Sequence, residues 1–124
     1  MKRPYKILIA DDDPGITDAL FTMLDFEGYD VEITHNGSDV LQLEEPLPDL
    51  LLLDIWMSGE DGRELCQALK SREETRRLPV LMISGSNDVA QSARNSGADD
   101  FIAKPFEMEE LLQKVAELIG RETG

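Results

Sequence analysis

Several side chains suited to binding cations or phosphate follow short apolar runs of this sequence. They are Asp11, Asp12 and Asp13 after residues 7–10, Asp54 after residues 50–53, Ser84 after residues 78–83, and Lys104 after residues 101–103. Each of them alone has a simpler interpretation, as a helix cap, a turn residue or a solvated charge. Because they recur at the ends of four apolar runs, one shared site is the better interpretation.

The residue types at these positions are suited to phosphoryl chemistry. Clustered carboxylates repel one another, and a hard divalent cation such as Mg²⁺ removes that cost by binding their oxygens. The group has no soft or nitrogen ligand, which argues against zinc. An ammonium and a hydroxyl can bind the oxygens of a tetrahedral dianion, and an Asp carboxylate can act as a nucleophile and become an aspartyl phosphate. Charge neutralisation and positioning are the main requirements of phosphoryl transfer.

The strands that would position these groups are short. Residues 50–53 are four consecutive leucines, a pattern typical of a central strand of a parallel sheet that is buried on both faces. Residues 7–10, 78–83 and 101–103 are further apolar runs, and residues 29–34 alternate apolar with polar side chains, as in a strand near a sheet edge.

Helical patterns separate these strands. Pro14 after an acidic residue predicts a helix start, and Gly28 predicts the end of that helix. Further helices are expected over residues 38–45, 63–72, 87–97 and 107–119. Five strands alternating with five helices predict an α/β fold, with a doubly wound five-stranded parallel sheet and helices on both faces. The carboxyl ends of its strands would then meet at one edge.

Length and charge limit the possible function. The 124 residues suggest a single domain over 1–124, with its core over about 5–120. A formal net charge of -14 makes direct nucleic-acid binding unfavourable. The single cysteine allows no internal disulfide, and no apolar run reaches the length of a membrane span. These features predict a cytoplasmic location and no membrane partner.

The order and spacing of these motifs resemble the receiver domain of two-component response regulators over nearly the whole chain. The matching segments are residues 7–14, 48–54, 57–62, 79–84, 97–101 and 104–106. The resemblance implies a flavodoxin-like fold with strand order 2-1-3-4-5. It also implies a regulatory domain that is not an enzyme in its own right, beyond its self-catalysed phosphotransfer and dephosphorylation.

The resemblance assigns roles to individual positions. Asp54 matches the phosphoacceptor, and Lys104 matches the phosphate-binding lysine, followed by a cis bond to Pro105. Asp12 and Asp54 match direct Mg²⁺ ligands together with the backbone carbonyl of Trp56, and Asp11 matches an acidic residue that reaches the metal through water. Two switch residues are also implied, the hydroxyl of Ser84 and the aromatic ring of Phe101.

The resemblance also implies partners. A histidine kinase or a histidine phosphotransfer protein would donate the phosphoryl group, and a downstream protein effector or output domain would read the change. A homodimer through the last two helices and the last strand is a further arrangement found in such domains. The readout face would include the last helix, the last strand and the helix before them.

The chain departs from the family pattern at four places. Ser58 replaces the usual proline, and Gly85 replaces a common alanine. Trp56 is bulky at a position whose side chain tends to lie over the phosphoryl group, so an altered rate of dephosphorylation is expected. Residues 84–97 are about two residues shorter than the family pattern. A short or displaced fourth helix is therefore expected.

Two other functions are compatible with a similar sheet. A small phosphohydrolase with an aspartyl nucleophile would need a second aspartate two residues after Asp54, where this chain has Trp56. A flavin or nucleotide binder would need a phosphate-binding loop after the first strand, where this chain has three aspartates. The sequence thus favours the signalling switch over both.

Overall fold

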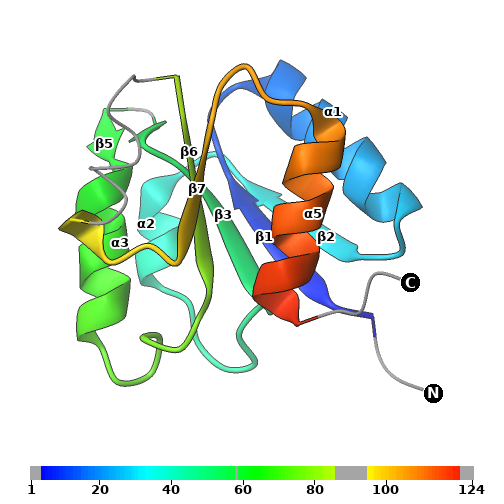
Figure 1. Ribbon diagram of the computed structural model, residues 1–124. Helices are drawn as coiled ribbons and strands as arrows, with labels where there is room; N and C mark the ends of the chain where they lie inside the picture. Colours follow the sequence, from blue (N-terminus) through cyan, green and yellow to red (C-terminus); the bar gives the residue numbers. More distant parts are fainter. Residues whose placement is uncertain (1–3, 58, 86–94, 121–124) are drawn as a thin grey trace.

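A computed structural model describes residues 4–57, 59–85 and 95–120 of the chain. Figure 1 shows its helices and strands. In chain order they are β1 (Lys6–Ala10), α1 (Pro14–Phe26), β2 (Asp30–Thr34), α2 (Gly37–Leu41), β3 (Leu50–Asp54), β4 (Trp56–Met57), β5 (Glu60–Asp61), α3 (Gly62–Ser71), β6 (Val80–Ser84), β7 (Asp100–Ala103) and α5 (Met108–Ile119).

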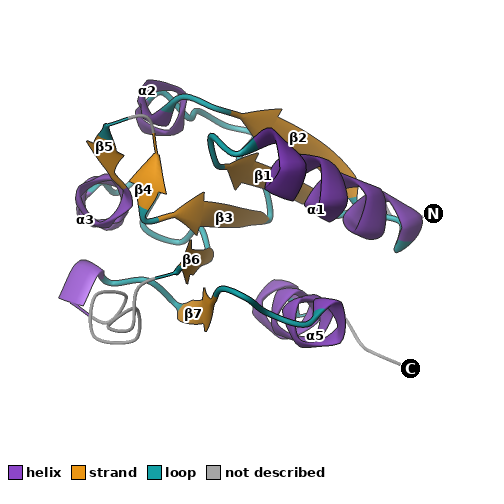
Figure 2. Ribbon diagram, turned by 90° about the horizontal axis from the view of Figure 1, so that it is seen from above, coloured by secondary structure: helices purple, strands orange, loops and turns teal. Residues whose placement is uncertain are grey.

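The main sheet has five strands in the order β2-β1-β3-β6-β7, and all neighbouring strands are parallel. Helices α1 and α5 lie on one face of this sheet, and α2 and α3 lie on the other (Figure 2). The predicted doubly wound α/β fold and its strand order are therefore confirmed. None of the described helices is long and apolar enough to cross a membrane.

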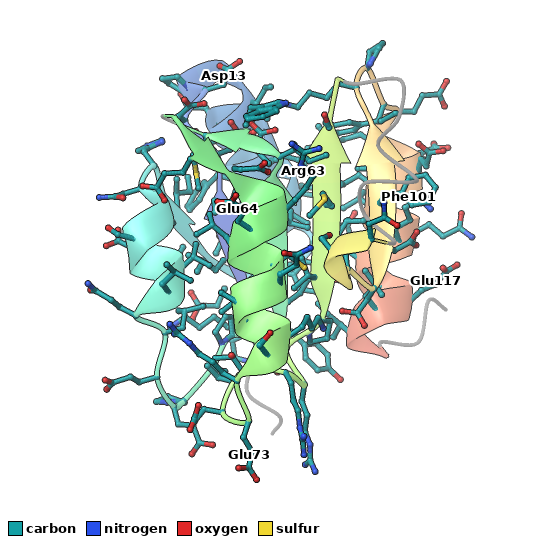
Figure 3. All side chains as sticks on the ribbon, turned by 90° about the vertical axis from the view of Figure 1, so that its left-hand side faces the viewer. Asp13, Arg63, Glu64, Glu73, Phe101 and Glu117 are labelled. Carbon is teal, nitrogen blue, oxygen red and sulfur yellow. The ribbon has the colours of Figure 1, made fainter. Side chains whose placement is uncertain are left out.

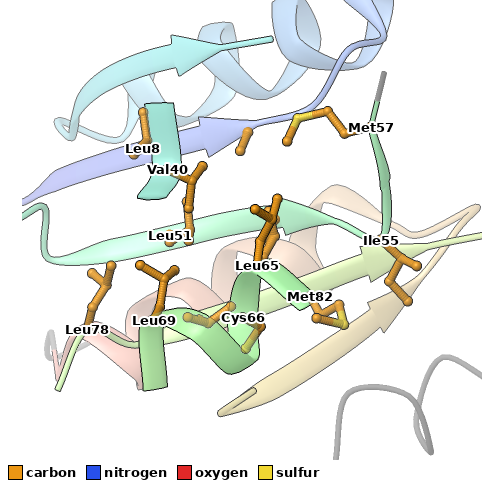
Figure 4. Packing of buried hydrophobic residues seen from close by; sticks show 13 residues of the cluster. Leu8, Val40, Leu51, Ile55, Met57, Leu65, Cys66, Leu69, Leu78 and Met82 are labelled. Atoms are coloured by element: carbon orange, nitrogen blue, oxygen red, sulfur yellow. The ribbon is translucent and has the colours of Figure 1, made fainter. Parts of the chain in front are cut away.

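The leucine run of β3 is buried because the sheet is covered on both sides. Leu51 and Leu53 belong to the apolar cluster under α2 and α3, whereas Leu50 and Leu52 belong to the cluster under α1 and α5. Successive residues of a strand point to opposite faces, so all four leucines are fully buried. Figure 4 shows the first of these clusters, which also includes Val40, Leu65 and Met82.

Local signals set the ends of α1. The Asp13 carboxylate accepts hydrogen bonds from the backbone N–H groups of Gly15 and Ile16 and so caps the helix, with Pro14 as its first residue. Gly28 follows the helix with φ of +94°, a conformation that favours glycine. Asp13 is thus occupied as a cap, while Asp11 and Asp12 remain at the strand end.

Two expectations from the sequence need correction, and two features lie at least partly beyond the described residues. The helix expected over residues 38–45 ends earlier, at Leu41, where the Arg72 guanidinium donates to the Leu41 carbonyl in place of a further helical N–H. The segment after Asp54 contains the short antiparallel pair β4–β5, which is not among the five strands expected from the sequence. Residues 87–94 of the expected fourth helix, and the departure at Ser58, lie outside the described residues.

Candidate functional site

The predicted site residues lie at the carboxyl ends of four neighbouring strands. Asp11 directly follows β1, Asp54 ends β3, Ser84 ends β6, and Lys104 directly follows β7. The backbone N–H of Lys104 donates to the carbonyl of Ser84 at 2.8 Å, which holds the last two of these strand ends together. A parallel sheet brings all its carboxyl ends to one edge, so four segments distant in sequence form one site.

Three carboxylates form the acidic part of this site. One ligand oxygen from each of Asp11, Asp12 and Asp54 lies within 4.8 Å of the other two. Asp11 is 1% exposed, Asp54 is 8% exposed, and Asp12 is exposed. A cluster of oxygen donors with one open side fits a hard divalent cation that keeps some of its water.

The side chain of Asp11 gives a second reason to expect a cation. Its Oδ1 accepts the backbone N–H of Asp13 at 3.0 Å, whereas its buried Oδ2 has no hydrogen-bond partner among the described residues. A buried carboxylate oxygen that lacks a hydrogen-bond donor is costly, and the nearest ammonium, that of Lys104, lies at 3.6 Å, beyond hydrogen-bond distance. The residues present therefore fit Mg²⁺, with Asp11, Asp12 and Asp54 as the group that would hold it.

Lys104 supplies positive charge between two of the carboxylates. Its Nζ lies 3.6 Å from Oδ2 of Asp11 and 3.7 Å from Oδ1 of Asp54. Both distances exceed a hydrogen bond, so the ammonium retains donors for a further anionic group. The peptide bond between Lys104 and Pro105 is cis.

Burial and charge both act on the Asp54 carboxyl. Desolvation is the largest influence, and together with the Asp11 charge it raises the pKa of Asp54 from 3.8 to about 6. The Lys104 ammonium and the backbone N–H of Trp56, which bonds the Asp54 carboxylate, lower the pKa but do not offset these effects. The charged form of Asp54 is therefore destabilised in this site, and a further positive charge nearby would stabilise it.

The two expected switch residues lie on adjacent strands. Ser84 is 2% exposed, at the end of β6. Phe101 is half-buried in β7 and packs against the cluster under α2 and α3. Nζ of Lys114, on α5, lies 5.8 Å from the centre of the Phe101 ring and 3.3 Å from Asp100 Oδ2. The aromatic ring therefore connects the sheet to α5.

Trp56 follows Asp54 by two residues, and its side chain is largely exposed to solvent. Ile55 and Met57 on either side are buried, whereas Trp56 is 58% exposed. Its backbone N–H donates a hydrogen bond to the Asp54 carboxylate. The expectation that its carbonyl binds a metal ion stays a prediction.

Three residues that support the site were not expected from the sequence. His35 Nδ1 donates to the backbone carbonyl of Asp11 at 2.8 Å. The N–H of Gly62 donates to the carbonyl of Ile55 at 2.6 Å, and Arg63 stacks on the Trp56 ring. The Asp61-Gly62 pair before a helix was a sequence signal for the contact between Gly62 and Ile55. The contacts of His35 and Arg63 join segments that no local sequence pattern connects.

Comparisons with known proteins agree with this geometry. The family model described as the response regulator receiver domain matches residues 7–116. The phosphate regulon transcriptional regulatory protein PhoB of Rhizobium meliloti (strain 1021) is 36% identical over 119 residues, which cover 94% of this chain and 52% of that protein. The chain thus spans about half the length of the curated relatives it matches.

Solved structures give the same result. The CheY-like receiver domain protein of Methanospirillum hungatei JF-1 has a TM-score of 0.83 at 34% identity and covers 95% of each chain. The receiver domain of the sensor histidine kinase PA1611 from Pseudomonas aeruginosa PAO1, solved with a magnesium ion in its active site cleft, has a TM-score of 0.83 at 27% identity, with 95% and 99% coverage. With its fold, its strand-end residues and the family match in agreement, this chain belongs to the response-regulator receiver-domain family.

Proposed function

We propose that this domain is a phosphorylation-controlled switch in which Asp54 accepts a phosphoryl group from a histidine kinase or a histidine phosphotransfer protein. The observation that carries the proposal is the position of Asp54, whose buried carboxyl group faces the Lys104 ammonium at 3.7 Å and lies beside two further carboxylates. The phosphohydrolase alternative lacks a corresponding observation, because Trp56 occupies the place of its second aspartate.

The transfer step follows from the residues at the strand ends. An Asp54 carboxylate oxygen attacks the phosphorus atom, the bond from phosphorus to the donor nitrogen breaks, and its electron pair stays with the donor imidazole. The Lys104 ammonium binds a phosphoryl oxygen and balances part of the added charge. Mg²⁺, held by Asp11, Asp12 and Asp54, would neutralise the carboxylates and the phosphoryl oxygens.

The response to phosphorylation would begin at Ser84. Its hydroxyl would donate to the new phosphoryl group, and Phe101 on the neighbouring strand would fill the space that Ser84 leaves. Phe101 touches Lys114 of α5, so this change would reach α5 and β7, two of the three elements of the expected readout face. A local charge change would thereby bias a two-state equilibrium that a downstream effector or output domain reads.

Intact mass spectrometry after incubation with acetyl phosphate and Mg²⁺ tests the proposal. We expect one added phosphoryl group in the wild type, none without Mg²⁺, and none in Asp54→Asn. Asp18→Asn removes an exposed carboxylate from α1 and is the matched control, which should be labelled like the wild type. Release of inorganic phosphate without a labelled protein would instead indicate a hydrolase.

Mg²⁺ binding is expected to stabilise the wild type without any phosphodonor. At a free concentration 100 times its Kd, a ligand that binds only the folded state adds about 2.7 kcal/mol to the free energy of unfolding. Asp12→Asn removes one of the three carboxylates, so a much smaller stabilisation by the same Mg²⁺ concentration is expected. Thermal unfolding with Mg²⁺ and with EDTA measures the difference, and equal stabilisation of both proteins would place the ion elsewhere.

A further inference from the structure

The guanidinium of Arg63 links the first turn of α3 to the segment that follows Asp54. Its Nε lies 2.9 and 3.2 Å from the two carboxylate oxygens of Asp61, and its Nη2 lies 2.8 Å from Asp61 Oδ2. Its Cζ lies 5.1 Å from the centre of the Trp56 ring. Figure 3 shows Arg63 at the same end of the molecule as Asp13, near the strand ends that form the site.

These contacts fix Trp56 from two directions. Trp56 pairs with Asp61 across the β4–β5 ladder, and Arg63 bonds Asp61 while stacking on Trp56. The Asp61 carboxylate also accepts a hydrogen bond from the backbone N–H of Arg63, so the pair of Asp61 and the Arg63 guanidinium is fixed to the start of α3. A guanidinium with a planar fork suits this double task, because it can bind a carboxylate edge-on while its face stacks on a ring.

The backbone of Trp56 contacts the phosphoacceptor. Its backbone N–H donates a hydrogen bond to the Asp54 carboxylate. Its exposed indole belongs to the residue two positions after Asp54. Loss of a phosphoryl group requires a water molecule to attack phosphorus, after which the bond from phosphorus to the Asp54 oxygen breaks and inorganic phosphate leaves. The family pattern places the side chain at this position over the phosphoryl group, and a large side chain there would hinder that approach.

We propose that Arg63 is a positioning residue that holds the Trp56 indole at the mouth of the phosphoacceptor site and so lengthens the lifetime of the phosphoryl group. This inference rests on the proposed function. It assigns Arg63 an effect that passes through Trp56 and requires no contact between Arg63 and the phosphoryl group.

A double-mutant cycle separates this role from a general structural one. The rate of phosphoryl loss is measured after removal of acetyl phosphate for the wild type, Arg63→Ala, Trp56→Ala and the double variant. Loss of a partly exposed cation–π contact is expected to make Arg63→Ala lose its phosphoryl group about 2- to 5-fold faster. In the Trp56→Ala background, the same change at Arg63 is expected to have no effect.

Two further variants keep the cycle interpretable. Arg63→Lys retains the charge but loses the planar fork, so it is expected to behave more like Arg63→Ala than like the wild type. Arg77→Ala removes an exposed arginine near the opposite end of the strands and should leave the rate unchanged. An unchanged rate in Arg63→Ala, or an equal acceleration with and without Trp56, would overturn the proposal.

Trp56 fluorescence provides a test that does not depend on phosphorylation. It is the only tryptophan of the chain, so its emission reports this position alone. We expect acrylamide to quench the fluorescence of Trp56 more strongly in Arg63→Ala than in the wild type or Arg77→Ala. Equal quenching would show that Arg63 does not hold the Trp56 side chain in place. If the wild type takes up no phosphoryl group, the proposed function fails by itself, and quenching still decides whether Arg63 holds Trp56.

Discussion

Asp54→Asn is expected to raise the free energy of unfolding of the metal-free protein by about 3 kcal/mol at pH 8. Burial and the Asp11 charge raise the pKa of Asp54 to about 6, against 3.8 for the unperturbed group. A shift of about two units corresponds to about 3 kcal/mol of unfavourable interaction of the charged form. Asparagine keeps the shape of the side chain and carries no charge, so this cost disappears.

The sign of the effect sets its pH dependence. The folded state binds the Asp54 proton more tightly than the unfolded state, so between pH 3.8 and about 6 the wild type loses stability as the pH rises. Below this window both states are protonated and the cost is absent. The advantage of Asp54→Asn should therefore grow from about 1 kcal/mol at pH 4.5 to about 3 kcal/mol at pH 8.

Urea unfolding in EDTA at these two pH values measures this difference. Asp18→Asn, on the exposed side of α1, makes the same change in net charge and should show a much smaller pH-dependent difference from the wild type. Equal stability of wild type and Asp54→Asn at pH 8 would mean that Lys104 already neutralises Asp54 in full. Excess Mg²⁺ should reverse the order, since it binds the wild-type carboxylates.

Much of this fold was predictable because its signals are local and repetitive. The leucines of β3 indicated a strand buried on both faces, and the two apolar clusters on either side of the sheet explain that pattern. Asp13 and Pro14 indicated the start of α1 through capping and a fixed φ. The strand order could not be predicted in this way, because periodicity does not determine which strands are neighbours. The expected order came from the family resemblance.

Details of the site were less predictable because they depend on approach between distant segments. The sequence placed Asp54 and Lys104 at strand ends, but it contained no information on the 3.7 Å distance between them. The fork from Arg63 to Asp61 and the stack on Trp56 exist only because β4 and β5 fold back on each other. A two-residue strand is too short to produce a periodic pattern.

Gly62 is the position where this dependence on close approach has its largest expected effect. A Cβ at Gly62 would lie 2.3 Å from the Asp54 carbonyl oxygen and 3.0 Å from the Cα of Ile55. Both atoms belong to the backbone, which cannot rotate away as a side chain can. Gly62→Ala is therefore expected to destabilise the protein by about 2–3 kcal/mol. In open space the change would have the opposite sign, since alanine is the better helix former.

The same displacement should impair phosphorylation, because the clash moves the residue that carries the nucleophile. A misplacement of about 1 Å can cost about 100-fold in rate, so labelling of Gly62→Ala by acetyl phosphate should be slower by at least about 10-fold. Gly85→Ala adds the same methyl group where no atom lies within 4 Å in the described part of the chain, and it is the matched control. Urea unfolding and intact-mass time courses on both variants measure the two effects. Wild-type stability in Gly62→Ala would show that α3 can move away from β3 without cost, and wild-type labelling would show that the Asp54 backbone need not be fixed.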